Sequence, residues 1–538
     1  YSPTSSPLLF LSSLSIINLS RSIRPLLFLH FFSGEARRLP ISTMISPPCF
    51  LSSAKAVLSS ASLKLQLLAL HTNSFYSSRC RTLKHLLSFF RLLVVNGDTF
   101  PVQLLYFLFI SFLGFLSLKL AGETPPPYTS LDVFFTSVSA CTTSSISVVE
   151  METFSNKQLI IITALMFTGG EVFASLLEAI AKTMKLQHAA DEYMNFISYK
   201  ALCYLIPLYL IAVHVIGASF IFVYFVLDAG ARAVLRRKRL QLLTFSLFTA
   251  TSTFSNCGFT PNNENMVAFR KNSGLLLLLI PLVLMGNTLY APMLVVMIRV
   301  MEKITKRSVF SYMLDHRKAI GFTHLLSGGH CRLLVGTVLG FVLVQFLMFC
   351  SLEWDSAAMT GMSRVEKTVA SLFQVVNSRH AGESVVDLSA LSPAMVVFFI
   401  LMMYLPPYTS FMIERETPDG TRKRGNAVWE RLLFSQLTYI TVFVILICIT
   451  EAEKLKKDPL NFSVLFIVLE VMSAYGNVGF SAGYSCERKL VPESSCRYVS
   501  YGLSGKWSTK GKILLVLVML FGRLKRQSLR TGKYWKLR

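Results

Sequence analysis

The order of apolar segments along this chain recurs four times, and it restricts the possible folds more than any other feature. Each time, a long apolar segment is followed by a shorter apolar segment that ends in a polar turn, and then by a second long apolar segment. The four shorter segments with their turns are residues 131–150, 241–259, 365–383 and 464–483. Because a repeat of this kind reflects a repeated architecture, we expect four similar structural units.

The long apolar segments have the composition of membrane-spanning helices. Several approach the ~20 residues that a helix needs to cross ~30 Å of hydrocarbon. Hydrophobic residues make up 53% of the chain and charged residues 15%. This predicts eight spans, the fourth kinked by Pro281 and Pro292. The segments are residues 102–120, 159–180, 201–227, 274–300, 333–352, 393–412, 432–449 and 513–524.

The shorter segments are predicted to enter the membrane and to leave it on the same side. Residues 131–150 are too few, and too polar at their end, to cross a bilayer. Polar backbone at depth is tolerated only where it is buried in protein or lines a water-filled cavity. An ordinary loop between two spans is the alternative, and the recurrence of the pattern disfavours it. The predicted fold is an all-α polytopic membrane protein with four tandem membrane–pore–membrane repeats and four re-entrant pore loops around one pore.

Basic residues set the predicted orientation of the repeats, which are residues 98–190, 191–325, 326–425 and 426–538. The linkers between repeats and the basic tail of the last repeat are rich in Lys and Arg, which places them in the cytoplasm. With an even number of spans, both termini are expected there. One basic run, from Arg232 to Arg239, falls on the predicted outer side, and the repeat pattern outweighs it.

Residues 1–97 do not share the repeat pattern. They are rich in Ser, Leu and Arg, begin with Tyr1 and contain a single acidic residue, Glu35. This composition is similar to that of an organelle transit peptide. We favour the alternative, a disordered leader or an over-extended gene reading, because no start residue precedes the segment.

Composition and motifs exclude several classes of function. The net charge is +24, but the basic surplus lies beside apolar runs rather than in an aromatic-interleaved domain that would bind nucleic acid. The sequence contains no phosphate-binding loop that would indicate ATP-driven transport. It also contains no His, Cys or Asp cluster that would indicate an enzyme, a metal site or a cofactor. Cys486 and Cys496 share a polar loop that we place outside, either as a disulfide or as free thiols.

Each short segment ends in a turn with one small residue at an equivalent place: Ser145, Gly258, Gly382 and Gly479. Glycine tolerates backbone angles closed to other residues, so several carbonyls can point the same way. Four such turns around one axis would form rings of carbonyl oxygens that replace the water shell of a cation. The negative C-terminal ends of the short helices would add a favourable potential. Glycines are common in ordinary turns, but their equivalent positions favour a selectivity filter.

The segments around these turns resemble the HKT transporters of plants, within the Trk/Ktr/HKT superfamily of potassium and sodium transporters. The resemblance covers residues 100–538 and not the leader. It is carried by SSISVVEMETFSN (144–156), TSTFSNCGFTPNNENM (251–266), LMGNTLYAP (284–292), FQVVNSRHAGES (373–384), SAYGNVGFS (473–481), and by GKWSTKGK and FGRLK near the end.

The resemblance implies transport of Na⁺, and in some members K⁺, across the plasma membrane, in a lipid bilayer, with a homodimer of one pore per subunit as an option. A serine at the first filter position, here Ser145, resembles the sodium-preferring branch. Asn256 and Asn287 stand at two positions where sodium-preferring relatives usually have asparagine. We therefore expect a channel-like sodium uniporter without a cofactor. A K⁺-permeable or Na⁺/K⁺ co-transporting member is the alternative, and a non-conducting membrane assembly subunit is a remote one.

Three further polar residues have two interpretations each. The resemblance implies a basic residue, Arg523, at a constriction below the filter. Because Lys525 and Arg526 follow at once, we expect Arg523 instead to extend from the cytoplasmic end of the last span. His214 is expected to be a packed side chain rather than a proton relay. Asn461 begins a glycosylation sequon that abuts the fourth short segment and is expected to be hard to reach.

Overall fold

The structure is a computed structural model that describes residues 99–122, 128–187, 192–405, 436–489 and 498–528, together with Tyr408 and Cys496. Contacts divide the chain into two units, Tyr1–His85 and Leu86–Arg538, and all described residues belong to the second. The predicted leader lies outside the described residues. In the described part the regular structure is helical, with one isolated β-bridge between Tyr484 and Val499.

The described helices follow the order that the sequence predicts. In repeats one and two they are α3 (Thr99–Leu120), α4 (Ser130–Cys141), α5 (Asn156–Gly169), α6 (Glu171–Leu186), α7 (Tyr193–Leu227), α8 (Ala229–Arg237), α9 (Leu242–Phe254), α10 (Ser273–Met285) and α11 (Tyr290–Thr305). The linker holds α12 (Ser308–Asp315) and α13 (Arg317–Ile320). In repeats three and four they are α14 (Gly328–Glu353), α15 (Arg364–Asn377), α16 (Pro393–Tyr404), α18 (Gln436–Thr450), α19 (Ala452–Lys457), α20 (Val464–Gly476) and α21 (Thr509–Ser528).

Three of these helices are each long and apolar enough to cross a membrane: Val102–Leu120 within α3, α7 and α14. The number becomes five if the bent pairs α5–α6 and α10–α11 are each counted as one span. Length and composition thus support a multi-pass membrane protein, and the total of eight spans stays a prediction.

The span predicted over residues 274–300 is bent between α10 and α11, as its two prolines predict. Pro281 and Pro292 lie inside the two helices, and the 81° bend falls at residues 286–289 between them. A Cβ built on Gly286 would lie 1.6 Å from the carbonyl oxygen of Phe254. The chain breaks where it passes against the end of α9. The break also lies in the turn just before Pro292, which has no N–H to donate to the carbonyl of residue 288.

Polar residues cap the N-termini of three of the four short helices. In α4, Thr129 and Asp132 form a capping box, in which each side chain accepts a hydrogen bond from the other residue's backbone N–H. Ser363 and Glu366 form the same box at α15, and Ser463 caps α20. These bonds satisfy backbone donors that have no partner within the helix, so α4, α15 and α20 each have a defined start, whereas α9 has no side-chain cap.

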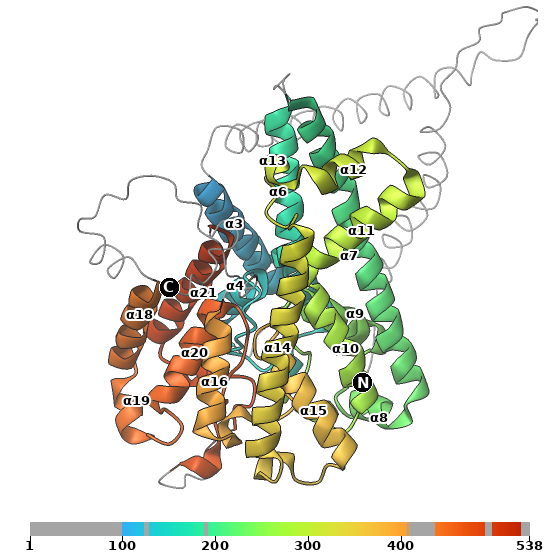
Figure 1. Cartoon of the computed structure of the whole chain (residues 1–538). Helices are drawn as coiled ribbons and strands as arrows, with labels where there is room; N and C mark the ends of the chain where they lie inside the picture. Colours follow the sequence, from blue (N-terminus) through green and yellow to red (C-terminus); the bar gives the residue numbers. More distant parts are fainter. Residues whose placement is uncertain are drawn as a thin grey trace, which may run out of the picture. The chain divides into compact units, whose positions relative to one another are not determined.

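The four short helices of the described chain, α4, α9, α15 and α20, pack in a closed order (Figure 1). Helix α9 contacts α5, α15 contacts α10 and α20 contacts α16, so each packs against a helix of the preceding repeat. Helix α4 contacts α21 of the last repeat, which closes the circle. This arrangement brings together four turns that are far apart in the sequence.

Candidate functional site

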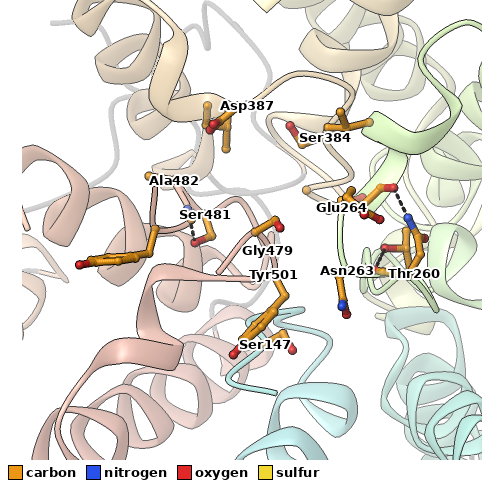
Figure 2. Close-up of a pocket in the computed structure, with 18 of the residues that line it drawn as sticks. Ser147, Thr260, Asn263, Glu264, Ser384, Asp387, Gly479, Ser481, Ala482 and Tyr501 are labelled. Carbon is orange, nitrogen blue, oxygen red and sulfur yellow. Dashed lines mark hydrogen bonds between the residues drawn. The ribbon is translucent and has the colours of Figure 1, made fainter. Parts of the chain in front are cut away.

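The four turns that follow the short helices line one cavity of about 370 Å³, whose wall is shown in Figure 2. Ser145, Gly258, Gly382 and Gly479 all contribute to its lining. Their backbone φ angles are 55°, 86°, 66° and 105°, all in the left-handed region that favours glycine. The structure therefore brings the four predicted filter residues together in one backbone conformation, and their role as an ion filter stays a prediction.

Neighbouring turns approach each other closely at the three glycines. A Cβ built on Gly258 would lie 1.5 Å from the carbonyl oxygen of Ala381, and one on Gly382 would lie 2.2 Å from that of Val478. A Cβ built on Gly479 would lie 2.4 Å from the Cβ of Ser145. Side chains are thus excluded at three of the four positions, and Ser145 supplies the one side chain of this ring.

The first, second and fourth turns share a backbone hydrogen bond. The N–H of the residue just before each filter position donates to the carbonyl of a serine in the preceding helix, at 2.9 to 3.0 Å. In the third turn the N–H of Gly382 itself donates to the carbonyl of Asn377 at 3.1 Å. The three shared pairs are Ser144 with Ser139, Cys257 with Ser252, and Val478 with Ser473.

A hydroxyl residue stands two positions after each filter residue, a regularity that we did not predict from the sequence. These residues also line the cavity and are labelled in Figure 2. Three of the hydroxyls donate to a carbonyl two residues further on, and the fourth, from Ser481, donates to Glu470. Superimposing the four turns on their filter positions would have shown the pattern in the sequence. The residues are Ser147, Thr260, Ser384 and Ser481.

Asn256 and Asn287 are both buried beside the second turn. The Nδ2 of Asn256 donates to the carbonyls of Phe254 at 3.0 Å and Val283 at 3.1 Å, so it joins the turn to α10. Asn287 lies in the break between α10 and α11, next to Gly286. Asn256 is thus hydrogen-bonded to backbone carbonyls, and these bonds hold the second turn against α10.

Comparison with known proteins shows to which family the chain is related. The sequence profile of the TrkH family, described as cation transport protein, matches residues 184–413 and 420–531. Sodium transporter HKT1 of Arabidopsis thaliana is 47% identical over 76% of this chain and 88% of its own length. Cation transporter HKT1;3 of Oryza sativa subsp. japonica is 42% identical over 87% of this chain and 96% of its own length.

The chain belongs to the HKT family of cation transporters. It is accordingly a transport protein and not an enzyme. Among solved structures, the potassium transporter TrkH from Vibrio parahaemolyticus is similar with a TM-score of 0.49 and 15% identity, over 82% of this chain and 86% of that chain.

Our expectation for Arg523 in this HKT transporter was wrong. Arg523 is 1% exposed and does not extend from the end of the span. Its guanidinium donates to the carbonyl of Gly169 and lies 5.6 Å from the ring centre of Phe107. The basic residues that follow in the sequence suggested a helix end, whereas packing from α3 and α5 buries the side chain.

The basic run after the third span lies at the rim of the cavity. Lys238 forms ion pairs with Glu152 at 2.9 Å and Glu264 at 2.6 Å, and Glu264 lines the cavity. Burial alone would lower the pKa of Lys238, but the hydrogen bonds to Glu264 and Glu152 outweigh it and raise that pKa above its ordinary value. Lys238 thus places its end of the run beside the cavity, and the side of the membrane on which the run lies stays a prediction.

The loop after the fourth turn also lines the cavity. Cys486 and Cys496 form a disulfide, which decides between the two alternatives that the sequence left open. Arg488, in the same loop, lies 3.5 Å from Asp387, and both residues line the cavity. The disulfide therefore closes a loop that forms part of the cavity rim.

Two other expectations are confirmed. His214 packs between the rings of Phe167 and Phe254, at centroid distances of 5.0 and 4.9 Å, and its Nδ1 contacts the carbonyl of Leu210. Asn461 is 1% exposed, and its Nδ2 donates to Asp458 and to the carbonyl of Ser485. The sequon asparagine is therefore enclosed and hydrogen-bonded within the fold.

Proposed function

We propose that this HKT transporter carries Na⁺ in preference to K⁺ across the plasma membrane, as a channel-like uniporter. The ion would pass through one pore formed by the four turns, with both termini in the cytoplasm and lipid against the apolar outer faces of helices such as α7. A homodimer would then hold one such pore in each subunit. The observation that carries the proposal is the hydroxyl side chain of Ser145 in a ring that otherwise consists of glycines.

The physical argument concerns the symmetry of the ring. K⁺ is larger and more weakly hydrated than Na⁺, and an even cage of carbonyl oxygens suits it. Ser145 breaks this evenness, because a Cβ built on Gly479 would lie only 2.9 Å from the Ser145 Oγ. The serine thus narrows the space beside Gly479 and adds an oxygen there. The similarity to a relative named as a sodium transporter supports the same direction.

Substitution Ser145→Gly is expected to raise permeability to K⁺ relative to Na⁺ by about tenfold, which corresponds to about 1.4 kcal/mol. Glycine accepts the left-handed backbone of this turn and removes the side chain that breaks the ring. Two-electrode voltage-clamp recording, with external Na⁺ exchanged for K⁺, gives the reversal potentials.

Ser145→Ala is the matched variant, since it removes the hydroxyl and keeps the Cβ. The wild-type reversal potential should follow external Na⁺ and ignore K⁺. A wild-type potential that follows both ions would favour the K⁺-permeable or co-transporting alternative. Surface expression without any cation current would favour a non-conducting assembly subunit.

The proposal gives Arg523 the role of a positive barrier below the turns. Arg523→Gln should raise the cation current several-fold at equal surface expression, because a buried positive charge repels cations nearby. Arg523→Lys, which keeps the charge, should leave the current near that of the wild type. Equal currents in the Gln and wild-type proteins would remove Arg523 from the ion pathway. Current per surface-labelled protein is the measured quantity.

A further inference from the structure

A short series of buried side chains connects the fourth turn to the first. The Nδ2 of Asn477 lies 2.7 Å from the Oγ of Ser144, which lies 2.8 Å from the Oγ1 of Thr142. Thr142 Oγ1 is in turn 2.8 Å from the carbonyl oxygen of Val138 in α4. Asn477, Ser144 and Thr142 are each 0% exposed. The series links residues that are 333 positions apart in the sequence.

The hydrogen bonds of this series run in one direction. The Val138 carbonyl can only accept, so the Thr142 hydroxyl donates its single proton there. Thr142 must then accept the proton of Ser144, and Ser144 must accept from Asn477. The carboxamide of Asn477 is therefore the first donor of the series.

The orientation of the Asn477 carboxamide is fixed by two further acceptors. Its Nδ2 lies 3.2 Å from the carbonyl oxygens of both Ala474 and Met519. Neither carbonyl can donate, so the nitrogen and not the oxygen must face them. The two protons of Nδ2 serve these three acceptors, so one proton is shared between two of them. Asn477 thus joins the end of α20, the wall helix α21 and the first turn.

This point lies directly behind the filter serine. Ser144 precedes Ser145, and Asn477 stands two residues before Gly479. Ser145 and Gly479 are the residues at which the first and fourth turns meet, since a Cβ on Gly479 would lie 2.4 Å from that of Ser145. A shift of the Asn477–Ser144 contact would therefore move Ser145 relative to the three filter glycines.

The equivalent residue of the second repeat behaves differently. Asn256 also stands two residues before its filter glycine and also has a left-handed backbone, with φ 54° against 49° for Asn477. Its Nδ2 reaches the carbonyls of Phe254 and Val283, both within its own repeat. Asn477 alone of this pair bonds a side chain of another repeat.

We propose that Asn477 is a specificity-determining positioning residue, whose carboxamide holds Ser145 through Ser144 in the position that favours Na⁺. This inference rests on the proposed sodium preference. Asn477 itself is not assigned a contact with the ion.

The experiment records the full chain by voltage clamp and compares the Na⁺/K⁺ permeability ratio of six proteins, the wild type, four variants and one control. Asn477→Asp keeps the shape and the left-handed backbone but presents oxygen to the Ala474 and Met519 carbonyls. Asn477→Gly keeps the backbone and removes the side chain, and Ser144→Ala removes the acceptor from the other turn. Each should lower the ratio by about tenfold, the size of effect expected from one lost buried hydrogen bond.

The fourth variant, Asn477→Gly with Ser144→Ala, separates this link from general damage. Both changes remove the Asn477–Ser144 bond, so the double variant should show a shift smaller than the product of the two single shifts. Lys306→Gly is the control, because Lys306 has φ 50° but ends α11 and lies outside the four turns.

The outcomes distinguish the inference from the function on which it rests. A sodium-selective wild type whose Asn477 and Ser144 variants keep its permeability ratio would overturn the inference alone. A double variant whose change in permeability ratio equals the product of the two single changes would overturn the inference as well. A wild type without sodium preference would contradict the proposed function and the inference with it. If the Asn477 variants fail to reach the surface, Ser144→Ala decides, since it leaves the two carbonyl bonds of Asn477 intact.

Discussion

Replacing Gly258 by alanine is expected to abolish most of the cation current, by more than about tenfold at equal surface expression, since each 1.4 kcal/mol is tenfold. The left-handed backbone at φ 86° is a first cause, because it costs an alanine roughly 1–2 kcal/mol. The second is larger: the new Cβ would lie 1.5 Å from the Ala381 carbonyl oxygen. One of the two turns must move, and the cavity wall moves with it. Current per surface-labelled protein measures the effect.

Gly340→Ala is the matched control for this substitution. Gly340 lies inside α14, and a Cβ built there meets no atom within 4 Å. The same chemical change should therefore leave the current intact and stabilise the helix by up to ~1 kcal/mol. Normal current through the Gly258→Ala protein would show that the second and third turns do not need to touch.

Local patterns in the sequence were sufficient to predict the helix order and the four turns. The length of an apolar segment and the small residue after a short helix are properties of neighbouring positions, and packing elsewhere changes them little. For the same reason Ser145, Gly258, Gly382 and Gly479 could be identified before the structure showed them around one cavity.

Contacts between repeats could not be predicted in this way. Arg523 was expected at a helix end because of the two basic residues after it, whereas Phe107 and Gly169 of the first repeat bury it. Within the second repeat, the prolines predicted a bend after α10, but the close approach of Gly286 to Phe254 at that bend could not be predicted. In each case the deciding neighbour is distant in the sequence and leaves no local signal.

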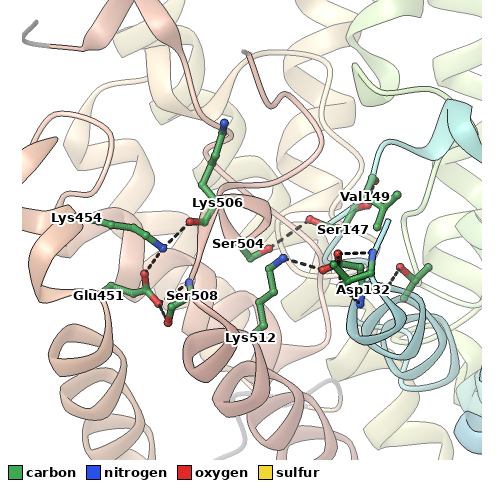
Figure 3. A network of polar contacts seen from close by, with 11 residues as sticks. Asp132, Ser147, Val149, Glu451, Lys454, Ser504, Lys506, Ser508 and Lys512 are labelled. Atoms are coloured by element: carbon green, nitrogen blue, oxygen red, sulfur yellow. Dashed lines mark hydrogen bonds and ion pairs between the residues drawn. The ribbon is translucent and has the colours of Figure 1, made fainter. Parts of the chain in front are cut away.

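The Lys512→Met substitution should destabilise the folded protein by about 3 kcal/mol, since removal of one partner from a buried ion pair typically costs 3–5 kcal/mol. Lys512 of α21 lies 2.7 Å from Asp132 of α4, with side chains 13% and 11% exposed (Figure 3). Asp132 would keep its charge without a cationic partner, although it also holds the capping box of α4. The midpoint of thermal unfolding in detergent measures the loss.

A double variant tests whether the unpaired charge is the cause. Asp132→Asn combined with Lys512→Met removes both charges, so it should recover most of the stability that Lys512→Met alone loses. Lys510→Met is the control on the same helix turn, because Lys510 is exposed, and exposed lysines contribute little to stability. If the double variant were as unstable as Lys512→Met, packing of the lysine stem would be the cause. Because the pair joins the first short helix to the last long helix, its loss should open the ring at the contact that closes it.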